Sequence, residues 1–490
     1  MIKIMNKKVV TRFAPSPTGF MHIGGVRTAL FAYLFAKKNN GTFILRIEDT
    51  DKAREVDGSI AHIQESLKWL GIDWDIGPDK PGDFGSVIQS ERLSTYKEYA
   101  DKLIAKGLAY PDPYTQEELE AFRKKAEEEK RPFLFRDHRP ETFETWDGTK
   151  PLRLKTPEIK RYKWVDAVRG ELEAGPEALD DFVLIKSDGY PTYNLAHIID
   201  DLNMGVTHIM RGDEFISSTP KFLSLYDALE IPYPVFVTLP PILRDDRTKK
   251  LGKRDGAKDI LDYKKEGYLP EAMINFLALI GWNPGTEQEI FSKDELIKVF
   301  DINKIQKAGG AFNEEKLDWV NKEHIKRLPI ETVREEVVSR LKNSSVGENI
   351  KFNDAEFVNK IANIVLDHIS KWGDIDTMVG AGELAFYFNT PEYSSALLSW
   401  KGDALENSKK HLEWTLEKIN ELEESEFETA DKIKNHIFDY ATENGRGNVL
   451  WPLRVSLSGL EKSPDPFTLL SVFGKDESVK RIDNAIKKIG

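Results

Sequence analysis

Residues 8–48 read KVVTRFAPSPTGFMHIGGVRTALFAYLFAKKNNGTFILRIE, and this segment decides the fold. Residues 8–13 predict a strand, and residues 25–38 carry the apolar pattern of a helix that ends at an Asn-Asn-Gly sequence. Residues 42–48 form a short apolar run bounded by turn signals, which is typical of a buried strand. The order strand, loop, helix, strand predicts a parallel sheet in a doubly wound α/β fold.

The same alternation continues along the first half of the chain. A second helix is expected at residues 59–70. Further strands are expected at residues 181–186, 206–212 and 234–240. Residues 86–186 are rich in charge and punctuated by proline, which predicts an inserted subdomain. Beyond about residue 328 strand signals almost vanish, and apolar side chains recur at helical spacing, so the C-terminal third is predicted to be all-α.

The composition is that of a globular chain with an acidic balance. The 490 residues include 70 basic and 82 acidic side chains, a net charge of −12, and no cysteine. Disulfides, thiolate-bound metals and thiol nucleophiles are therefore excluded. The net charge argues against a nucleic-acid partner, although binding depends on local basic surface. The chain has neither a targeting pattern at its start nor a run of about 18 apolar residues, so we expect no membrane span and a cytoplasmic location.

The loop between the first strand and the first helix carries the first chemical signal. Gly24 and Gly25 let backbone approach a ligand closely, the helix N-terminus favours an anion, and His22 can donate a hydrogen bond to a phosphate. A short HIGG motif also arises by chance, and the alternative is a plain turn with a surface histidine.

The second signal is a basic loop, KKLGKR, at residues 249–254. Gly252 gives this loop backbone freedom, so that Lys250, Lys253 and Arg254 could reach phosphates. The alternative interpretation is a solvated charged loop.

Two further groups of polar side chains lie at the ends of predicted strands. Glu48 ends the first buried strand, and the carboxyl ends of strands face the ligand crevice in such sheets. Tyr193 and His197 lie one turn apart on a predicted helix, and Arg211 and Glu214 lie at the end of a later strand. The structural alternatives are caps and turns, a core tyrosine, surface ion pairs and a buried, satisfied histidine.

In this order on one α/β scaffold, the motifs resemble class I aminoacyl-tRNA synthetases, and within that class the bacterial glutamyl-tRNA synthetases. PSPTGFMHIGG is similar to the HIGH-type signature and KLGKR to the KMSKR-type signature, and RIEDTD, WLGIDWDIGPD and VTHIMRGDE are similar to the family as well. The resemblance covers nearly the whole chain and is weaker in the C-terminal helices. Two departures stand out: Gly252 replaces the usual serine, and residues 110–139, where some members bind zinc, contain no cysteine.

The resemblance implies a division into domains. Residues 1–85 and 187–245 would form a Rossmann-type (HUP-like) α/β catalytic domain, and residues 86–186 an inserted α/β acceptor-binding subdomain. Residues 246–328 would hold the KMSKR-type loop and a stem-contact region, and residues 329–490 an all-α anticodon-binding region.

The implied reaction joins L-glutamate and ATP, with Mg²⁺, into glutamyl-adenylate and then transfers glutamate to the 3′ end of tRNA-Glu. The substrate's own carboxylate attacks phosphorus, so the enzyme positions groups and stabilises charge without a protein nucleophile. The implied partners are tRNA-Glu, glutamate and ATP; the family suggests a monomer, and no zinc is expected.

The resemblance also assigns site residues. The catalytic set is His22, Lys250, Lys253 and Arg254. The ATP-binding set is His22, Gly24, Gly25, Glu214, Leu243 and Lys253. The glutamate-binding set is Arg12, Ala14, Ser16, Glu48, Tyr193, His197 and Arg211. Within this set, Glu48 suits the substrate α-ammonium and Arg12 suits the substrate side-chain carboxylate. Arg211 is the other candidate for binding that carboxylate.

Three alternatives stay open on the sequence. A glutaminyl-tRNA synthetase would share the catalytic core but carry β-barrels at its C-terminus. A truncated relative that modifies a tRNA base would lack the helical region, and an inactive paralogue would only bind tRNA. The choice between charging tRNA-Glu alone and charging tRNA-Gln as well depends on anticodon contacts in the helical region, where the resemblance is weaker.

Overall fold

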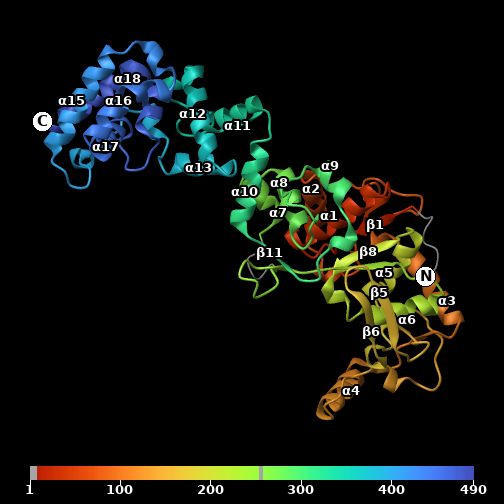
Figure 1. Cartoon of the computed structure of the whole chain (residues 1–490). Helices are drawn as coiled ribbons and strands as arrows, with labels where there is room; N and C mark the ends of the chain where they lie inside the picture. Colours follow the sequence, from red (N-terminus) through yellow and green to blue (C-terminus); the bar gives the residue numbers. More distant parts are fainter. Residues whose placement is uncertain (1–7, 253–257) are drawn as a thin grey trace. The chain divides into compact units, whose positions relative to one another are not determined.

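The computed structural model describes residues 8–252 and 258–490 (Figure 1). They form two compact units. The first comprises the chain up to Lys265 together with Leu269–Val320, and the second comprises Glu266–Tyr268 and Asn321–Gly490. Every predicted site residue that the structure describes lies in the first unit, whereas Lys253 and Arg254 lie outside the described residues.

The first unit begins with the strand–helix–strand segment that the sequence predicts. β1 (Val10–Phe13) and β2 (Thr42–Leu45) pair in parallel along their whole length, and α1 (Ile23–Lys38) connects them. Gly41 follows α1, and a side chain there would collide with the carbonyl of Val9. Because Gly41 has no side chain, its backbone can lie against Val9 where the chain enters β2.

A second pair of parallel strands extends this arrangement. β8 (His208–Gly212) pairs with β9 (Val235–Leu239), and the amide of Thr207 donates to the carbonyl of Val10 at 2.9 Å, which places β8 beside β1. The connecting helices are α2 (Ser59–Trp69), α5 (Tyr193–Asn203) and α6 (Thr219–Leu229). The predicted α/β fold with a parallel sheet is confirmed.

One antiparallel hairpin completes the sheet. β5 (Tyr162–Asp166) pairs with β6 (Gly170–Ala174), and Asp166 bridges Phe236 of β9, so that the four strands have the order β6-β5-β9-β8. The Asp166 carboxylate accepts hydrogen bonds from the amide and hydroxyl of Thr238 at 3.0 and 2.6 Å. From the sequence, these residues are expected in the insertion and no strand is predicted there, because alternation of apolar and polar side chains does not reveal which sheet a strand joins.

The rest of the insertion is a small α/β subdomain, with α4 at its far end in Figure 1. Its elements are α3 (Leu93–Ala105), β3 (Ala109–Pro111), α4 (Gln116–Glu128), β4 (Leu152–Leu154) and β7 (Val183–Ile185). The strands form an antiparallel sheet in the order β3-β4-β7, so the strand predicted at residues 181–186 exists but pairs outside the parallel sheet. Asp181 ties the subdomain together, because its carboxylate accepts from the Tyr110 hydroxyl and from two nitrogens of Arg139, each at 2.7 Å.

Short elements follow the sheet. They are β10 (Ile242–Leu243), α7 (Ile260–Lys265), α8 (Pro270–Leu279), α9 (Lys293–Val299), β11 (Gly310–Ala311) and α10 (Glu314–Ile325). β10 and β11 pair in parallel, and α8 and α9 pack against α1. The Arg27 guanidinium of α1 donates to the carbonyls of Pro240 and Ile280, which ties these segments to the first helix.

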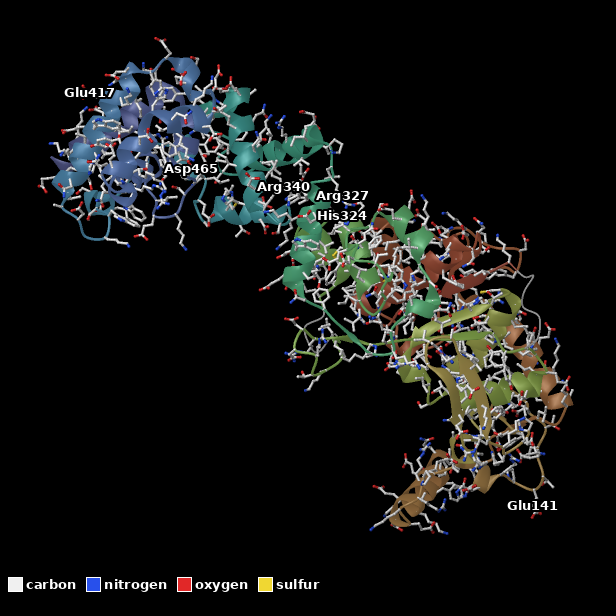
Figure 2. The ribbon with its side chains drawn as sticks, in the orientation of Figure 1. Glu141, His324, Arg327, Arg340, Glu417 and Asp465 are labelled. Carbon is white, nitrogen blue, oxygen red and sulfur yellow. The ribbon has the colours of Figure 1, made fainter. Side chains whose placement is uncertain are left out.

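The second unit contains helices and no strand in residues 321–490, all of which the structure describes. Its helices are α11 (Ile330–Lys342), α12 (Ala355–His368), α13 (Gly373–Gly380), α14 (Ala385–Phe388), α15 (Leu405–Glu421), α16 (Ala430–Glu443), α17 (Arg446–Ser458) and α18 (Pro466–Ile489). Asp465, labelled in Figure 2, caps α18 by accepting from the amides of Phe467 and Thr468 at 3.0 and 3.1 Å. The predicted all-α C-terminal region is confirmed.

Among the residues that the structure describes, no helix combines the length and the apolar composition that crossing a membrane requires.

Candidate active site

His22 lies at the N-terminus of α1, where it is the capping residue. Its Nδ1 accepts a hydrogen bond from the amide of Gly24 at 3.1 Å, so a neutral imidazole carries its proton on Nε2 and is a donor there. A side chain at position 24 would lie 2.8 Å from Cε1 of His22, so glycine lets the ring lie against the helix terminus. An imidazole donor and the amide end of a helix together suit a phosphate.

The basic loop lies against β10. Leu243 and Lys250 form an antiparallel bridge, and the amide of Leu251 donates to the carbonyl of Ile242 at 2.8 Å. The Lys250 ammonium lies 2.9 Å from the carboxylate of Glu214, and both side chains are about half exposed. Burial opposes ionisation of Glu214, but the hydrogen bond and charge of Lys250, together with hydrogen bonds from the backbone of Glu214 itself and from Asp213, outweigh burial and lower the pKa of that carboxyl. Leu243 and Glu214 of the predicted ATP-binding set are thus brought together with Lys250 of the predicted catalytic set.

A buried cluster of charges lies at the ends of β1 and β2. Asp201 of α5 accepts from Arg12 at 3.0 Å and from Arg46 at 2.6 Å, and Arg46 also donates to Glu48 at 2.8 Å. All four side chains are buried. Burial would raise the pKa of Asp201, yet Arg12 and Arg46 lower it to about 2. The positive charge of Arg12 is therefore already matched by a carboxylate.

Glu48 lies beside the loop that follows β1. Its amide donates to the carbonyl of Pro15 at 3.0 Å, so the loop that contains Ala14 and Ser16 lies beside the backbone of Glu48. Burial raises the pKa of Glu48, and the attraction of Arg46 and Arg12 only partly opposes this shift. A ligand cation placed here would favour the ionised form.

Tyr193 and His197 stack on α5, with ring centroids 4.4 Å apart and an interplanar angle of 12°. The His197 Nδ1 lies 2.6 Å from the carbonyl of Tyr193, so it donates there. Burial lowers the pKa of His197 to about 3. Burial and the Glu48 carboxylate raise the pKa of Tyr193 to about 12. His197 is thus a neutral, buried side chain that packs against Tyr193.

Arg211 ends β8 and is buried, with 7% of its surface exposed. Its Nη2 donates to the hydroxyl of Thr219 at 3.1 Å, and Phe222 lies 4.8 Å from the guanidinium carbon. In the described part of the chain, Nη1 has no hydrogen-bond partner and no carboxylate pairs with the group. Burial lowers the pKa of Arg211. A buried cation of this kind suits an anionic ligand.

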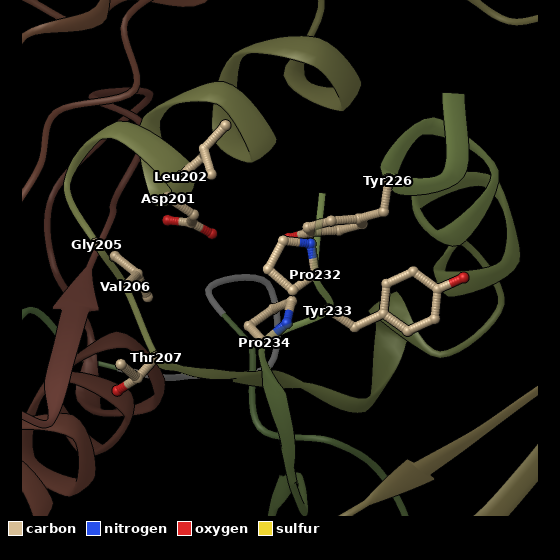
Figure 3. A pocket seen from close by; sticks show the side chains of 9 residues that line it. All are labelled: Asp201, Leu202, Gly205, Val206, Thr207, Tyr226, Pro232, Tyr233 and Pro234. Carbon is tan, nitrogen blue, oxygen red and sulfur yellow. The ribbon is translucent and has the colours of Figure 1, made fainter. Parts of the chain in front are cut away.

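A cavity of about 120 Å³ lies beside Asp201 of the buried charge cluster (Figure 3). Asp201, Tyr226 and Tyr233 are among its lining residues, and the Tyr226 hydroxyl points across it toward Asp201. No protein partner of that hydroxyl occurs among the described residues, so ordered water is the partner that the space allows. None of the predicted site residues that the structure describes lines this cavity.

Two residues of the charge cluster are missing from the predicted set. Arg46 is a cation inside the apolar run TFILRIE, and this anomaly was a usable signal. Asp201 follows His197 by one helical turn, but nothing in the local pattern shows that it meets β1 and β2.

The fold and these loops define the class of protein. Residues 8–319 match the family described as tRNA synthetases class I (E and Q), catalytic domain, and residues 332–486 match the family described as anticodon binding domain.

Relatives named as glutamate–tRNA ligases define the branch of that class. The glutamate–tRNA ligase of Clostridium kluyveri is 40% identical over 493 residues, 98% of each chain, and that of Clostridium acetobutylicum is 38% identical over 496 residues, 98% of this chain and 99% of the relative. The crystal structure of a glutamate tRNA ligase from Elizabethkingia meningosepticum, in complex with its amino acid, matches with a TM-score of 0.86 and 35% identity over 99% of this chain and 100% of that chain. The enzyme from Elizabethkingia anophelis matches with a TM-score of 0.82 and 36% identity over 98% and 100% of the two chains. The chain belongs to the glutamate–tRNA ligase family, as the resemblance predicts.

Proposed function

We propose that this chain forms glutamyl-adenylate from L-glutamate and ATP and transfers the glutamyl group to the 3′ end of tRNA-Glu. The relationship to glutamate–tRNA ligases over the full length supports the reaction. The observation that carries the amino-acid assignment is the buried Arg211 guanidinium, which has no carboxylate partner among the described residues.

In the activation step, a glutamate α-carboxylate oxygen forms a bond to the α-phosphorus of ATP while the bond to pyrophosphate breaks. His22 and the first amides of α1 would hold phosphate oxygens, and Lys250, with Lys253 and Arg254, would stabilise the charge on the leaving group. Mg²⁺ would arrive with the triphosphate as part of the substrate. Among the described residues no group of three or more acidic or histidine side chains could hold a metal ion.

ATP binding would require Lys250 to leave Glu214. Their ion pair is half exposed, and such pairs contribute only about 0–1 kcal/mol, so breaking it to bind ATP costs little free energy. Once released, Glu214 and the backbone of Leu243 would face the nucleoside, and Lys250 would face phosphate.

In the glutamate pocket, the partners of the two candidate arginines favour Arg211 over Arg12 as the residue that binds the substrate side-chain carboxylate. Arg12 is paired with Asp201, whereas Arg211 lies beside Tyr193 without a carboxylate. We assign the substrate side-chain carboxylate to Arg211 and Tyr193, with Arg12 keeping Asp201 in place. Glu48 would bind the α-ammonium, whose charge would hold that carboxyl ionised.

For tRNA, we propose acceptor binding by residues 86–186, stem contacts by residues 246–328 and anticodon binding by residues 329–490. A cavity of about 520 Å³ in the second unit supports the last assignment. Phe386 and Tyr387 are among its lining residues, together with the charged Glu383, Glu461 and Lys462, and the buried Tyr387 hydroxyl has no partner among the described residues. Aromatic faces with a few polar atoms suit an unstacked base.

We propose a monomer, as the family resemblance implies, and the substrates tRNA and ATP support action in the cytoplasm. Light scattering of the purified protein would test the first statement.

ATP–pyrophosphate exchange with tRNA-Glu present tests the activation reaction. Wild-type protein should exchange with glutamate and far less with glutamine, whereas an inactive paralogue would not exchange at all. His22→Ala and Lys253→Ala should each lower the rate by about 10²–10³-fold with little effect on tRNA binding. Charging assays with tRNA-Glu and tRNA-Gln in competition would then show which tRNA is accepted.

A further inference from the structure

A histidine–aspartate pair lies next to the HIGH-type loop, outside the proposed substrate pockets. His62 of α2 stacks on Phe20 with ring centroids 4.6 Å apart, and its Nε2 lies 2.9 and 2.8 Å from the two carboxylate oxygens of Asp259. The two side chains are 12% and 22% exposed, so this contact is largely shielded from water. Asp259 lies shortly after the KLGKR segment in the sequence.

The same imidazole reaches the backbone of the HIGH-type loop. The amide of Met21 donates to Nδ1 of His62 at 3.4 Å, and the carbonyl of Met21 accepts from the amide of Ile260 at 3.0 Å. His22 and Asp259 form an antiparallel bridge. The backbone at Met21 and His22 is therefore held between α2 and the start of α7.

A ring with its proton on Nε2 donates to Asp259 and accepts from the amide of Met21 at Nδ1, since the hydrogen bond of one ring nitrogen sets the role of the other. The Ser66 hydroxyl also lies 3.3 Å from Nδ1, but it donates to the carbonyl of His62 at 2.7 Å, which leaves the Met21 amide as the donor to Nδ1. Asp259 is itself oriented, because its Oδ1 accepts from the amide of Leu261 at 2.9 Å. The carboxylate thus fixes both the tautomer and the orientation of the ring.

We propose that His62 is a positioning residue for glutamate activation: with Asp259 it holds the backbone at Met21 and thereby sets the place of the His22 imidazole. The proposal rests on the proposed role of His22. A displacement of about 1 Å at a group that stabilises the reacting charge can lower a rate by about 10²-fold, so a residue that sets this position affects the rate without touching substrate.

The test compares kcat and KM for ATP in pyrophosphate exchange, with tRNA-Glu present and the active-site concentration titrated. We expect His62→Ala and Asp259→Asn each to lower kcat about tenfold and to change KM for ATP less than about threefold, because His22 acts mainly on charge that develops during the reaction. Unchanged kcat in His62→Ala would overturn the proposal.

A double-mutant cycle shows whether His62 acts through His22. In a His22→Ala background, His62→Ala should lower kcat by less than about twofold, because the group that it positions is gone. A further tenfold loss in that background would overturn the proposal.

Glu65→Gln is the matched control. Glu65 of α2 pairs with Lys264 of α7 at 3.2 Å, so it joins the same two helices, but both side chains are about half exposed. We expect its kcat to stay within about twofold of wild type. A loss equal to that of His62→Ala would mean that any tether between α2 and α7 has this effect, and the proposal would fall.

His62→Gln covers the case in which the alanine variant does not fold. Its amide keeps a donor toward Asp259, so we expect kcat within about threefold of wild type and above that of Asp259→Asn. A glutamine variant that folds, by its melting curve, but is as slow as Asp259→Asn would contradict the proposal. If the wild-type protein itself shows no exchange, the proposed function fails as well; active wild-type protein with unaffected His62 variants rejects the positioning role alone.

Discussion

Arg211 and Arg12 are both buried guanidinium groups, and their different partners lead to different expectations. Arg211→Gln should lower kcat/KM for glutamate by about 10- to 150-fold, which corresponds to a charge-assisted hydrogen bond of about 1.5–3 kcal/mol. It should also narrow the preference for glutamate over glutamine, because the neutral amide no longer meets a cation. Pyrophosphate exchange with each amino acid measures both effects.

Arg12→Gln is the matched variant, because it removes the same charge from a group that Asp201 already pairs. We expect lower thermal stability, since Asp201 then keeps only Arg46, and a glutamate preference within about threefold of wild type. If Arg12→Gln loses the preference for glutamate over glutamine while Arg211→Gln keeps it, Arg12 binds the substrate side-chain carboxylate, as expected from the sequence.

His197 leads to a prediction on pH. Burial lowers its pKa from 6.5 to about 3, so between these values the unfolded chain binds one proton more than the folded chain. The contribution of His197 to the free energy of unfolding therefore falls by about 1.4 kcal/mol for each pH unit below about 6.5. The difference in unfolding free energy between wild type and His197→Gln should shrink between about pH 6.5 and 4.5 in urea titrations. A constant difference would contradict the neutral, buried state.

At the scale of elements, the insertion depends on one buried carboxylate. Asp181→Asn keeps the size of the side chain but leaves Arg139 without its ion pair. We expect a loss of about 3 kcal/mol, the lower end for a broken buried pair, because Arg139 is partly exposed. Limited proteolysis should then cleave the segment between β3 and β4 faster than in the wild type.

Glu144→Gln is the control for that experiment. It removes the exposed pair with Lys150, at 2.7 Å, from the same insertion, and should change stability by less than about 1 kcal/mol. Equal cleavage of both variants would show that the buried position of Asp181 is not what holds the insertion.

At the scale of the whole molecule, the chain must bind a polyanion despite a net charge of −12. Binding by local basic surface releases counterions, so tRNA affinity should fall by about 10³-fold or more between about 50 and 200 mM salt. Fluorescence anisotropy with labelled tRNA-Glu measures this slope. An affinity independent of salt would contradict the proposed tRNA interface.

Local sequence determined much of this protein. The periods of apolar residues predict β1, α1 and β2 and the all-α second unit, because each pattern is a property of neighbouring residues. The order of the HIGH-type and KMSKR-type motifs predicts the synthetase family for a similar reason, since each motif is a short segment with its own loop geometry.

Tertiary structure alone decided how charges and strands are partnered. Arg12 meets Asp201, 189 positions away, and His62 meets Asp259, 197 positions away. The β5–β6 hairpin likewise joins β9 through Asp166 rather than staying within the insertion. No periodicity encodes such contacts, because they depend on which distant segments the folded core brings together. For the same reason, only the folded structure shows that Arg12 is paired with a carboxylate whereas Arg211 can bind an anion.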